Sequence, residues 1–230
     1  MTPPVPVALA LADRLEAALP QTQCTRCGYP DCRGYALAMA EGSAEINRCP
    51  PGGAEGITRL AALTGRPVLT LDPARGHEGP RALAVIDEAW CIGCTLCIKA
   101  CPVDCIVGAS KQMHTVIDPL CTGCELCVPV CPVDCIAMVP VTGTDTGWQA
   151  WTAAQADEAR ERYAFHQRRL QRELQENDER LAARAEARLA DLAGQATTTD
   201  PAALDAKRAV IEAARQRARA RQAAADSHDA

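Results

Sequence analysis

The sequence predicts an α+β protein with a small amino-terminal domain, a central domain of two similar halves, and a long α-helical carboxyl-terminal extension. Three observations support this fold class. One cysteine motif occurs twice in the middle of the chain with the same spacing. Aromatic residues make up only 3% of the 230 residues, too few for one large conventional core. From Trp148 onward the composition changes to Ala, Arg, Gln and Glu, with no further cysteine.

The repeated motif reads Cys-x2-Cys-x2-Cys-x3-Cys-Pro in both copies. This spacing is typical of a two-cluster ferredoxin domain, in which the last cysteine of each run ligates the other [4Fe–4S] cluster. One predicted cluster therefore has the ligands Cys91, Cys94, Cys97 and Cys131. The other predicted cluster has the ligands Cys121, Cys124, Cys127 and Cys101.

Other uses of these cysteines fit the sequence less well. Disulfides need an oxidising compartment, but the amino-terminal segment has no basic region, and Asp13, Arg14 and Glu16 interrupt its apolar run. Zinc sites usually pair two Cys-x2-Cys units that lie a dozen or more residues apart, whereas here three cysteines fall within seven residues in each copy of the motif. Attachment of haem requires Cys-x-x-Cys-His, which the chain lacks.

A third cysteine group lies upstream, and Gly28, Pro30 and other turn-forming residues surround it. We predict a third [4Fe–4S] cluster in this first domain, because a cluster-binding domain follows it. A zinc knuckle and a reactive thiol pair stay open as alternatives for this group. Its four predicted ligands are Cys24, Cys27, Cys32 and Cys49.

Two cysteines remain, Cys105 and Cys135, each four residues beyond the last cysteine of its run. We interpret them as small buried thiols that pack near the clusters. A spare ligand or a redox-sensitive thiol is the alternative, and nothing in the sequence selects it.

The stretches LPQTQCTRCGYPDCRGYA, CPPGG and AVIDEAWCIGCTLCIKACPVDCIVGASKQMHTVIDPLCTGCELCVPVCP together resemble the B subunit of the bacterial Rnf/Rsx electron transport complex. The resemblance covers about residues 9 to 140. It implies a small iron–sulfur domain followed by a two-cluster ferredoxin domain. It also implies a protein that relays electrons within a membrane complex, which exchanges them between NADH and ferredoxin with ion pumping. Relatives also keep an iron–sulfur transcription regulator reduced.

The chain departs from this family in two ways. Family members usually begin with a hydrophobic anchor of about twenty residues, the length that a bilayer span needs. Here the first apolar stretch is short and interrupted by charges, and it reads as an amphipathic helix with Leu11, Leu15 and Leu19 on one face. The other departure is the carboxyl-terminal extension. We therefore expect a cytoplasmic protein that is at most peripheral at the cytoplasmic face of the inner membrane.

Prolines and glycines divide the chain into parts. We predict an amino-terminal helix and cluster domain over 1–65, a linker over 66–81, the two-cluster domain over 82–141 and the helical extension over 148–230. Within these parts we expect shorter elements. The expected helices cover 7–19, 33–41 and 54–64, and the expected strands cover 82–86 and 115–117.

The extension has a helical pattern with clear start signals. Thr152 and Gln155 fit a capping box that opens a helix of about 40 residues, and Gly194 marks its exit. Asp200 and Pro201 open a second helix that reaches about Ala223. Polar residues interrupt the heptad pattern, so we favour a solvated helical hairpin over a coiled coil.

Charge differs along the chain. Residues 1–149 carry ten basic and fifteen acidic side chains, a net charge of −5, whereas residues 207–221 carry a local net charge of +5. The acidic part could steer a basic redox partner, or it could serve solubility alone. The basic segment lacks the large apolar face of a membrane-surface helix, and we interpret it as solvated, without a nucleic-acid partner.

The chain has no Gly-x-Gly-x-x-Gly motif, Walker loop or His-Glu-x-x-His motif, so we expect no nicotinamide, flavin or substrate-transforming site. We interpret the four histidines, His77, His114, His166 and His228, as structural or exposed. The leading hypothesis is an electron-transfer protein that relays single electrons between a donor and an acceptor protein, which could be other Rnf/Rsx-like subunits. The alternative is a redox-sensing or regulatory iron–sulfur protein that signals through its helical tail. In both cases we expect residues 20–140 to unfold largely without iron and sulfide.

Overall fold

The structure is a computed structural model that describes residues 5–191 and 200–226. Its contacts form two compact units, Met1–His166 and Gln167–Ala230. The first unit contains all fourteen cysteines. It consists of a helical region, residues 5–65, and a central region, residues 82–141, which are treated in turn.

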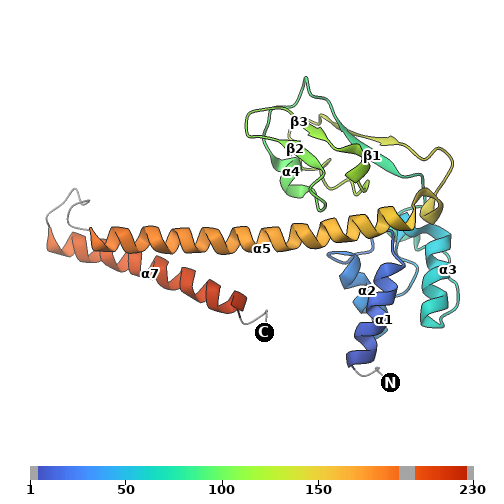
Figure 1. The fold of residues 1–230 in the computed structure, drawn as a ribbon, viewed down its shortest axis with the longest axis horizontal. Coiled ribbons are helices and arrows are strands. Elements are labelled where there is room, and N and C mark those ends of the chain that lie inside the picture. Colours follow the sequence, from blue (N-terminus) through green and yellow to red (C-terminus); the bar gives the residue numbers. More distant parts are fainter. Residues whose placement is uncertain (1–4, 192–199, 227–230) are drawn as a thin grey trace. The chain divides into compact units, whose positions relative to one another are not determined.

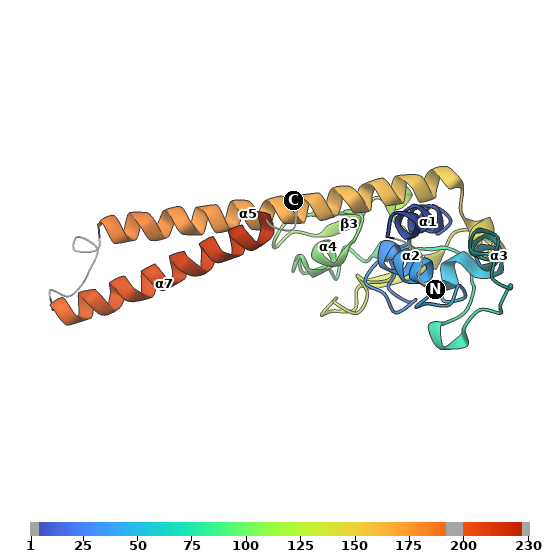
Figure 2. The same cartoon turned by 90° about the horizontal axis from the view of Figure 1, so that it is seen from below.

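Three helices form the helical region: α1 (Val5–Ala17), α2 (Cys32–Glu41) and α3 (Gly53–Thr64). They match the predicted helices within two residues at each end. Left-handed glycines end α2 and α3 at the predicted positions, with φ of 82° at Gly42 and 70° at Gly65. Helices α1 and α2 lie side by side (Figures 1 and 2). The largest buried side chains between the helices are Leu15, Leu19, Tyr35, Met39, Ile57 and Leu60.

Two small antiparallel sheets and one short helix form the central region (Figure 1). Strand β1 (Ala82–Ile86) pairs with β4 (Ile136–Pro140), and β2 (Ile106–Gly108) pairs with β3 (His114–Val116). Helix α4 (Leu96–Ala100) precedes β2. Each sheet therefore takes one strand from each sequence repeat, the exchange that a pseudo-twofold arrangement of the halves requires. Strands β1 and β3 lie where the sequence predicts them, whereas β2 and β4 were not predicted.

Trp148 joins the chain after β4 to the helical region. Its indole N–H donates a hydrogen bond of 2.9 Å to the carbonyl oxygen of Ala18. The guanidinium of Arg59 lies 4.1 Å from the centre of its ring. Trp148 belongs to a single turn of 3₁₀ helix, one of four such turns in the described residues: Pro50–Gly52, Pro73–Arg75, Asp118–Leu120 and Gly147–Ala150.

The extension contains two long helices, α5 (Ala153–Ala190) and α7 (Pro201–Asp226). The predicted capping box opens α5: the N–H of Gln155 donates to the Thr152 hydroxyl, and the N–H of Thr152 donates to the Gln155 side chain. Asp200 caps α7 through the N–H of Ala202. The predicted exit at Gly194 lies outside the described residues.

The second compact unit has the form of the predicted hairpin. Arg215 and Arg219 of α7 both pair with Glu186 of α5 at 3.2 Å. Both views show the two helices side by side over this part of their length (Figures 1 and 2). Most of the described side chains here are exposed, which agrees with a solvated hairpin.

Candidate iron–sulfur centres

The amino-terminal cysteines lie on two loops and one helix end. Cys24 and Cys27 lie on the loop after α1, Cys32 is the first residue of α2, and Cys49 directly precedes a 3₁₀ turn. Burial raises the pKa of the Cys32 thiol well above its ordinary value, and the neighbouring Cys49, Cys24 and Cys27 thiols add to this shift. The four predicted ligands are therefore close neighbours in a largely buried site.

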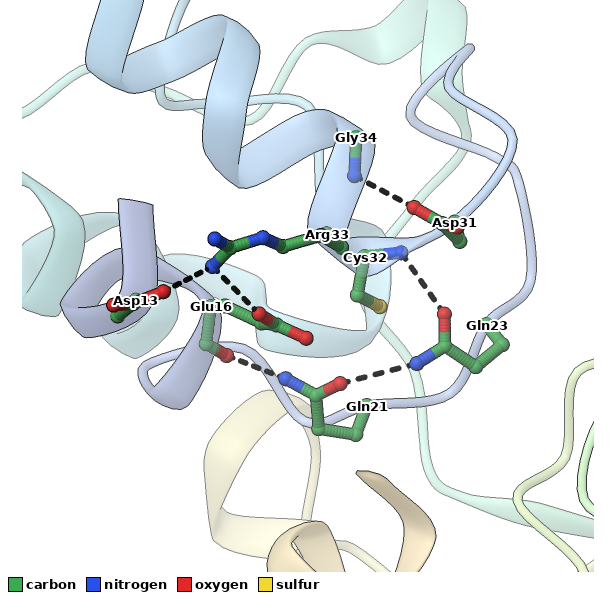
Figure 3. Close-up of polar contacts among 8 residues, drawn as sticks. All are labelled: Asp13, Glu16, Gln21, Gln23, Asp31, Cys32, Arg33 and Gly34. Atoms are coloured by element: carbon green, nitrogen blue, oxygen red, sulfur yellow. Dashed lines mark hydrogen bonds and ion pairs between the residues drawn. The ribbon is translucent and has the colours of Figure 1, made fainter. Parts of the chain in front are cut away.

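A relay of amide side chains holds this cysteine loop in place (Figure 3). Gln21 donates to the carbonyl of Glu16 at the end of α1, and Gln23 donates to the Gln21 side chain at 3.0 Å. The N–H of Cys32 in turn donates to the Gln23 side chain at 2.9 Å. Both glutamines are at most 2% exposed. The relay ties α1 to the first turn of α2 and fixes the loop that carries Cys24 and Cys27.

Contacts of charged side chains also stabilise the start of α2 (Figure 3). Asp31 caps α2 by accepting from the N–H of Gly34 at 2.6 Å. Arg33 reaches back to α1 and pairs with Asp13 at 2.5 Å and with Glu16 at 3.0 Å. Sequence reasoning did not identify these supporting residues. The partners of Arg33 lie 20 and 17 residues away, whereas the Asp31 cap, three residues from Gly34, is a local signal that was overlooked.

Left-handed residues recur beside the cysteines. In the central region they occupy equivalent positions of the two repeats, with φ of 68° and 64° at Gly93 and Thr95, and 69° and 65° at Gly123 and Glu125. Left-handed residues that alternate with right-handed ones turn successive N–H groups toward one concave side, a geometry found at anion and iron–sulfur sites. A threonine or glutamate in this conformation is strained, which points to a functional constraint on the loop.

Glycine is required at the first of these positions. A Cβ atom on Gly93 would lie 2.4 Å from the backbone nitrogen of Gln112, and one on Gly123 would lie 2.4 Å from the carbonyl oxygen of Ala82. Both neighbours are backbone atoms of the opposite repeat or of the segment leading to it. Each cysteine loop therefore packs directly against backbone atoms, and this close packing requires a residue without a side chain at the glycine position.

The thiols of Cys121, Cys124 and Cys127 share a pocket with Cys101 of the other repeat. Ala84, Ile106 and Met138 contribute apolar walls. Burial raises the pKa of Cys124 to about 12, and the nearby thiols of Cys101, Cys127 and Cys121 add to the shift. The N–H of Ala84 donates to the sulfur of Cys121 at 3.5 Å. Cys101 therefore lines the same pocket as three cysteines of the second repeat.

The other predicted set is arranged more openly. Burial raises the pKa of Cys97, and the thiols of Cys94 and Cys91 add to the shift. The sulfur of Cys131 lies 3.5 Å from that of Cys135, and Cys135 in turn is close enough to Cys91 for that thiol to affect its pKa. Burial, the hydrogen bond with Cys131 and the charges of Cys131 and Cys91 raise the pKa of Cys135 to about 12.

Cys105 occupies the equivalent place in the first repeat and is 2% exposed. Its sulfur lies 3.4 Å from that of Cys101, and its N–H also donates to the Cys101 sulfur at 3.3 Å. The hydrogen bond with the Cys105 thiol lowers the pKa of Cys101 to about 7 and that of Cys121 to about 6. This position agrees with the interpretation of Cys105 as a small buried thiol that packs beside the site.

Contacts between the helical and central regions bring two of the cysteine groups together. Arg26 pairs with Glu125 at 2.6 Å and lies close enough to Cys24 and Cys124 for both thiols to affect its pKa. The hydroxyl of Thr122 donates to the carbonyl oxygen of Thr22 at 3.1 Å. The amino-terminal group therefore adjoins the group that contains Cys121, Cys124 and Cys127.

The first turns of α5 contact both cysteine-bearing regions. Arg162 donates to the carbonyl oxygens of Val103 and Asp104, just after Cys101, at 2.9 and 3.2 Å. Tyr163 donates to Asp31, the residue before Cys32, at 3.0 Å. His166 bonds to Asp104 at 2.7 Å. These contacts tie the start of the extension to the loops that hold two of the cysteine groups.

The donor sets suit iron–sulfur clusters. Thiolates are the usual ligands of [4Fe–4S] clusters, and N–H groups that face sulfur stabilise the negative charge. In the described part of the chain, no three His, Cys, Asp or Glu side chains converge tightly enough to hold a single metal ion. The thiols of Cys101, Cys121, Cys124 and Cys127 line one shared pocket.

Comparisons with known proteins agree with this geometry. Residues 84–138 match a family described as "4Fe-4S dicluster domain", and residues 19–51 match one described as "Putative Fe-S cluster". The chain is 63% identical over 139 residues to the B subunit of the ion-translocating oxidoreductase complex of Azoarcus sp., a match that covers 60% of this chain and 76% of the relative. This chain belongs to the family of these B subunits.

Other members of this B-subunit family give the same result. The proteins of the same name from Alkalilimnicola ehrlichii and Thiobacillus denitrificans are 57% and 60% identical to the chain. These matches cover 67% and 46% of this chain, and 83% and 57% of the two relatives. No solved structure matches the chain.

The comparisons confirm the resemblance stated from the cysteine motifs. The chain is an iron–sulfur electron-transfer protein of the B-subunit family, with a 4Fe–4S dicluster match over residues 84–138 and an Fe–S cluster match over residues 19–51. Among its described helices, none combines the length and the apolar character that crossing a membrane requires.

Proposed function

We propose that this chain binds three [4Fe–4S] clusters and relays single electrons between protein partners as the B subunit of an ion-translocating oxidoreductase complex. Each cluster, when bound, supplies a site that gains or loses one electron. The protein supplies the thiolates, the N–H groups that face them and the apolar walls that limit the access of water. The observation that carries the proposal is the shared pocket of Cys101 with Cys121, Cys124 and Cys127.

The proposed ligand sets are those of the sequence motifs. The first is Cys24, Cys27, Cys32 and Cys49, the second is Cys91, Cys94, Cys97 and Cys131, and the third is Cys121, Cys124, Cys127 and Cys101. We also propose the domain boundaries predicted from the sequence: an amino-terminal domain over 1–65, a linker over 66–81, a two-cluster domain over 82–141 and a helical extension over 148–230. The proposed partners are a donor and an acceptor protein, among them other subunits of the complex, at the cytoplasmic face of the membrane.

Contacts between the regions support an order for the relay. Arg26 lies near Cys24 of the first set and Cys124 of the third, and Cys97 of the second set lies near Cys127 of the third. The third set therefore lies in the middle of the proposed path. Arg26 places a positive charge between two sites that become more negative on reduction, which favours an electron on either side of it.

Iron analysis tests the number of clusters. We expect anaerobically reconstituted protein to contain about twelve iron atoms, four for each set of four cysteines. Stepwise reduction should then show three one-electron centres by low-temperature electron paramagnetic resonance (EPR). A count of about eight would remove the amino-terminal cluster, and bound zinc there would support the zinc alternative.

A second candidate function, redox sensing through the helical tail, is favoured by one observation. Arg162 of α5 bonds to Val103, two residues after Cys101, and Tyr163 bonds to Asp31, the residue before Cys32. A change at either cysteine group therefore reaches the start of a helix that continues to Ala190. For a sensor, we expect hydrogen exchange of residues 153–166 to change at least about tenfold between the reduced and oxidised full-length protein. Equal exchange in both states favours the electron carrier alone.

A further inference from the structure

His114 makes a contact that the proposed relay does not by itself require. It opens strand β3, and its side chain is 1% exposed. Its Nδ1 atom lies 3.3 Å from the sulfur of Cys97, which belongs to the second proposed ligand set. An imidazole in this place can act on the cluster only through the cysteine, so it is a candidate positioning residue and not a ligand.

The chemistry of the sulfur decides which nitrogen carries the proton. An iron-bound cysteine is a thiolate and has no proton to donate, so a hydrogen bond with it requires Nδ1 to be the donor. The other nitrogen, Nε2, is buried and has no hydrogen-bond partner among the described residues. A proton on Nε2 would therefore be a buried, unsatisfied donor, which is costly. The first argument places a proton on Nδ1, and the second disfavours one on Nε2.

The backbone opposite His114 fixes the position of the ring. Gly108 of β2 pairs with His114 across the small sheet. A Cβ atom on Gly108 would lie 2.3 Å from Cδ2 of the imidazole, so the ring occupies the space that a side chain would take. The ring thus packs directly on the main chain of β2. This packing holds Nδ1 toward Cys97 before any cluster is reduced.

The first repeat has a different side chain at the position equivalent to His114. Aligning the sequence VID at residues 116–118 with VID at residues 85–87 places Leu83 of β1 at the position of His114. Leu83 pairs with Val139, so no glycine lies opposite it. At that cluster the cysteine equivalent to Cys97 is Cys127, and a leucine stands where the histidine would be. The imidazole donor is thus specific to one of the two proposed clusters of the central region.

We propose that His114 donates its Nδ1 proton to the sulfur of Cys97 and so raises the reduction potential of the cluster held by Cys91, Cys94, Cys97 and Cys131. Reduction adds negative charge to the cluster and its sulfurs, and an N–H that points at a sulfur stabilises the reduced form more than the oxidised form. The inference rests on the proposed function, because it needs a cluster at this site. It adds a residue that sets how readily this site accepts an electron.

A set of three variants of the reconstituted full-length protein tests the proposal. His114→Leu removes the donor, His114→Asn keeps an N–H near the position of Nδ1, and His166→Leu removes another buried histidine, whose partner is Asp104. Redox titration followed by EPR should show the equilibrium constant for reduction of one central cluster falling about threefold to tenfold in His114→Leu. We expect His114→Asn to recover most of this loss and His166→Leu to leave that cluster unchanged.

The outcomes separate the two proposals. A wild-type protein with no cluster at Cys97 would reject the proposed function. A His114→Leu protein with full iron and unchanged midpoints would reject the role of His114 alone, as would an equal shift of all three clusters. If His114→Leu does not retain the cluster, pulsed EPR of reduced wild-type protein with ¹⁵N-labelled histidine decides. A coupling to histidine nitrogen that His114→Asn abolishes supports the hydrogen bond, and its absence from the wild type overturns it.

Discussion

Removal of iron and sulfide is expected to unfold the central region, residues 82–141, while α1, α2 and α3 keep their packing. The reason lies in the composition of the two cores. Five of the ten buried core residues of the central region are cysteines. Its only aromatic residue, Trp90, is 70% exposed. Its sheets have two strands each, of three to five residues, which are marginal without further support.

The helical region has a core of its own. Only three of its sixteen buried core residues are cysteines. Tyr35 packs in that core and stacks on Tyr29 with ring centres 5.5 Å apart. Its hydroxyl donates to the carbonyl oxygen of Glu45 at 2.8 Å. From the sequence alone we expect residues 20–140 to unfold. The different cysteine content of the two cores limits this expectation to the central region.

Hydrogen exchange with mass spectrometry, after anaerobic chelation, measures this difference. We expect the protection factors of the β1 and β4 amides to fall at least about a hundredfold, because a loss of about 3 kcal/mol of local stability lowers a protection factor by that much. Amides of α2 and α3 should lose less than about tenfold. Reconstitution with iron and sulfide is the control and should restore β1 and β4. Unchanged protection of these strands in protein shown to be free of iron would contradict the expectation.

Local signals in the sequence predict most of the helices. Gly42 and Gly65 end α2 and α3, and Thr152 with Gln155 opens α5, because each signal acts within one turn of a helix. The same reason explains why the cysteine loops are recognisable: three of the four proposed ligands of each central cluster lie within seven residues.

Contacts between distant residues could not be predicted in this way. Strand β1 pairs with β4 about fifty residues later, and neither the short apolar run of β4 nor its turn residues specify that partner. In the sequence Trp148 marks only the start of a change in composition, yet its indole bonds to Ala18. His114 has the pattern of an isolated structural histidine, because its partner Cys97 becomes a neighbour only when the β2–β3 hairpin folds back. Which residues support a site depends on the tertiary fold, and the cysteine motif gives little information about them.

The crossed ligand sets predict which pairs of cysteine substitutions lose the same cluster. Cys101 and Cys124 belong to one proposed set, whereas Cys94 belongs to the other. Replacing Cys101 or Cys124 by Ala should each remove about four of about twelve iron atoms. The pair Cys101→Ala with Cys124→Ala should also remove about four, because both substitutions destroy the same cluster. The pair Cys101→Ala with Cys94→Ala should remove about eight.

The neighbouring thiol must be controlled in this experiment. The Cys105 sulfur lies 3.4 Å from that of Cys101 and could replace it as a ligand. All variants are therefore made together with Cys105→Ala, and Cys105→Ala alone should keep the full iron content, since it removes a packed thiol and no ligand. Iron and sulfide analysis with EPR on anaerobic protein gives the counts. If instead Cys101 with Cys94 loses about four iron atoms and Cys101 with Cys124 loses about eight, each repeat holds its own cluster. The pocket that Cys101 shares with the second repeat argues for the crossed result.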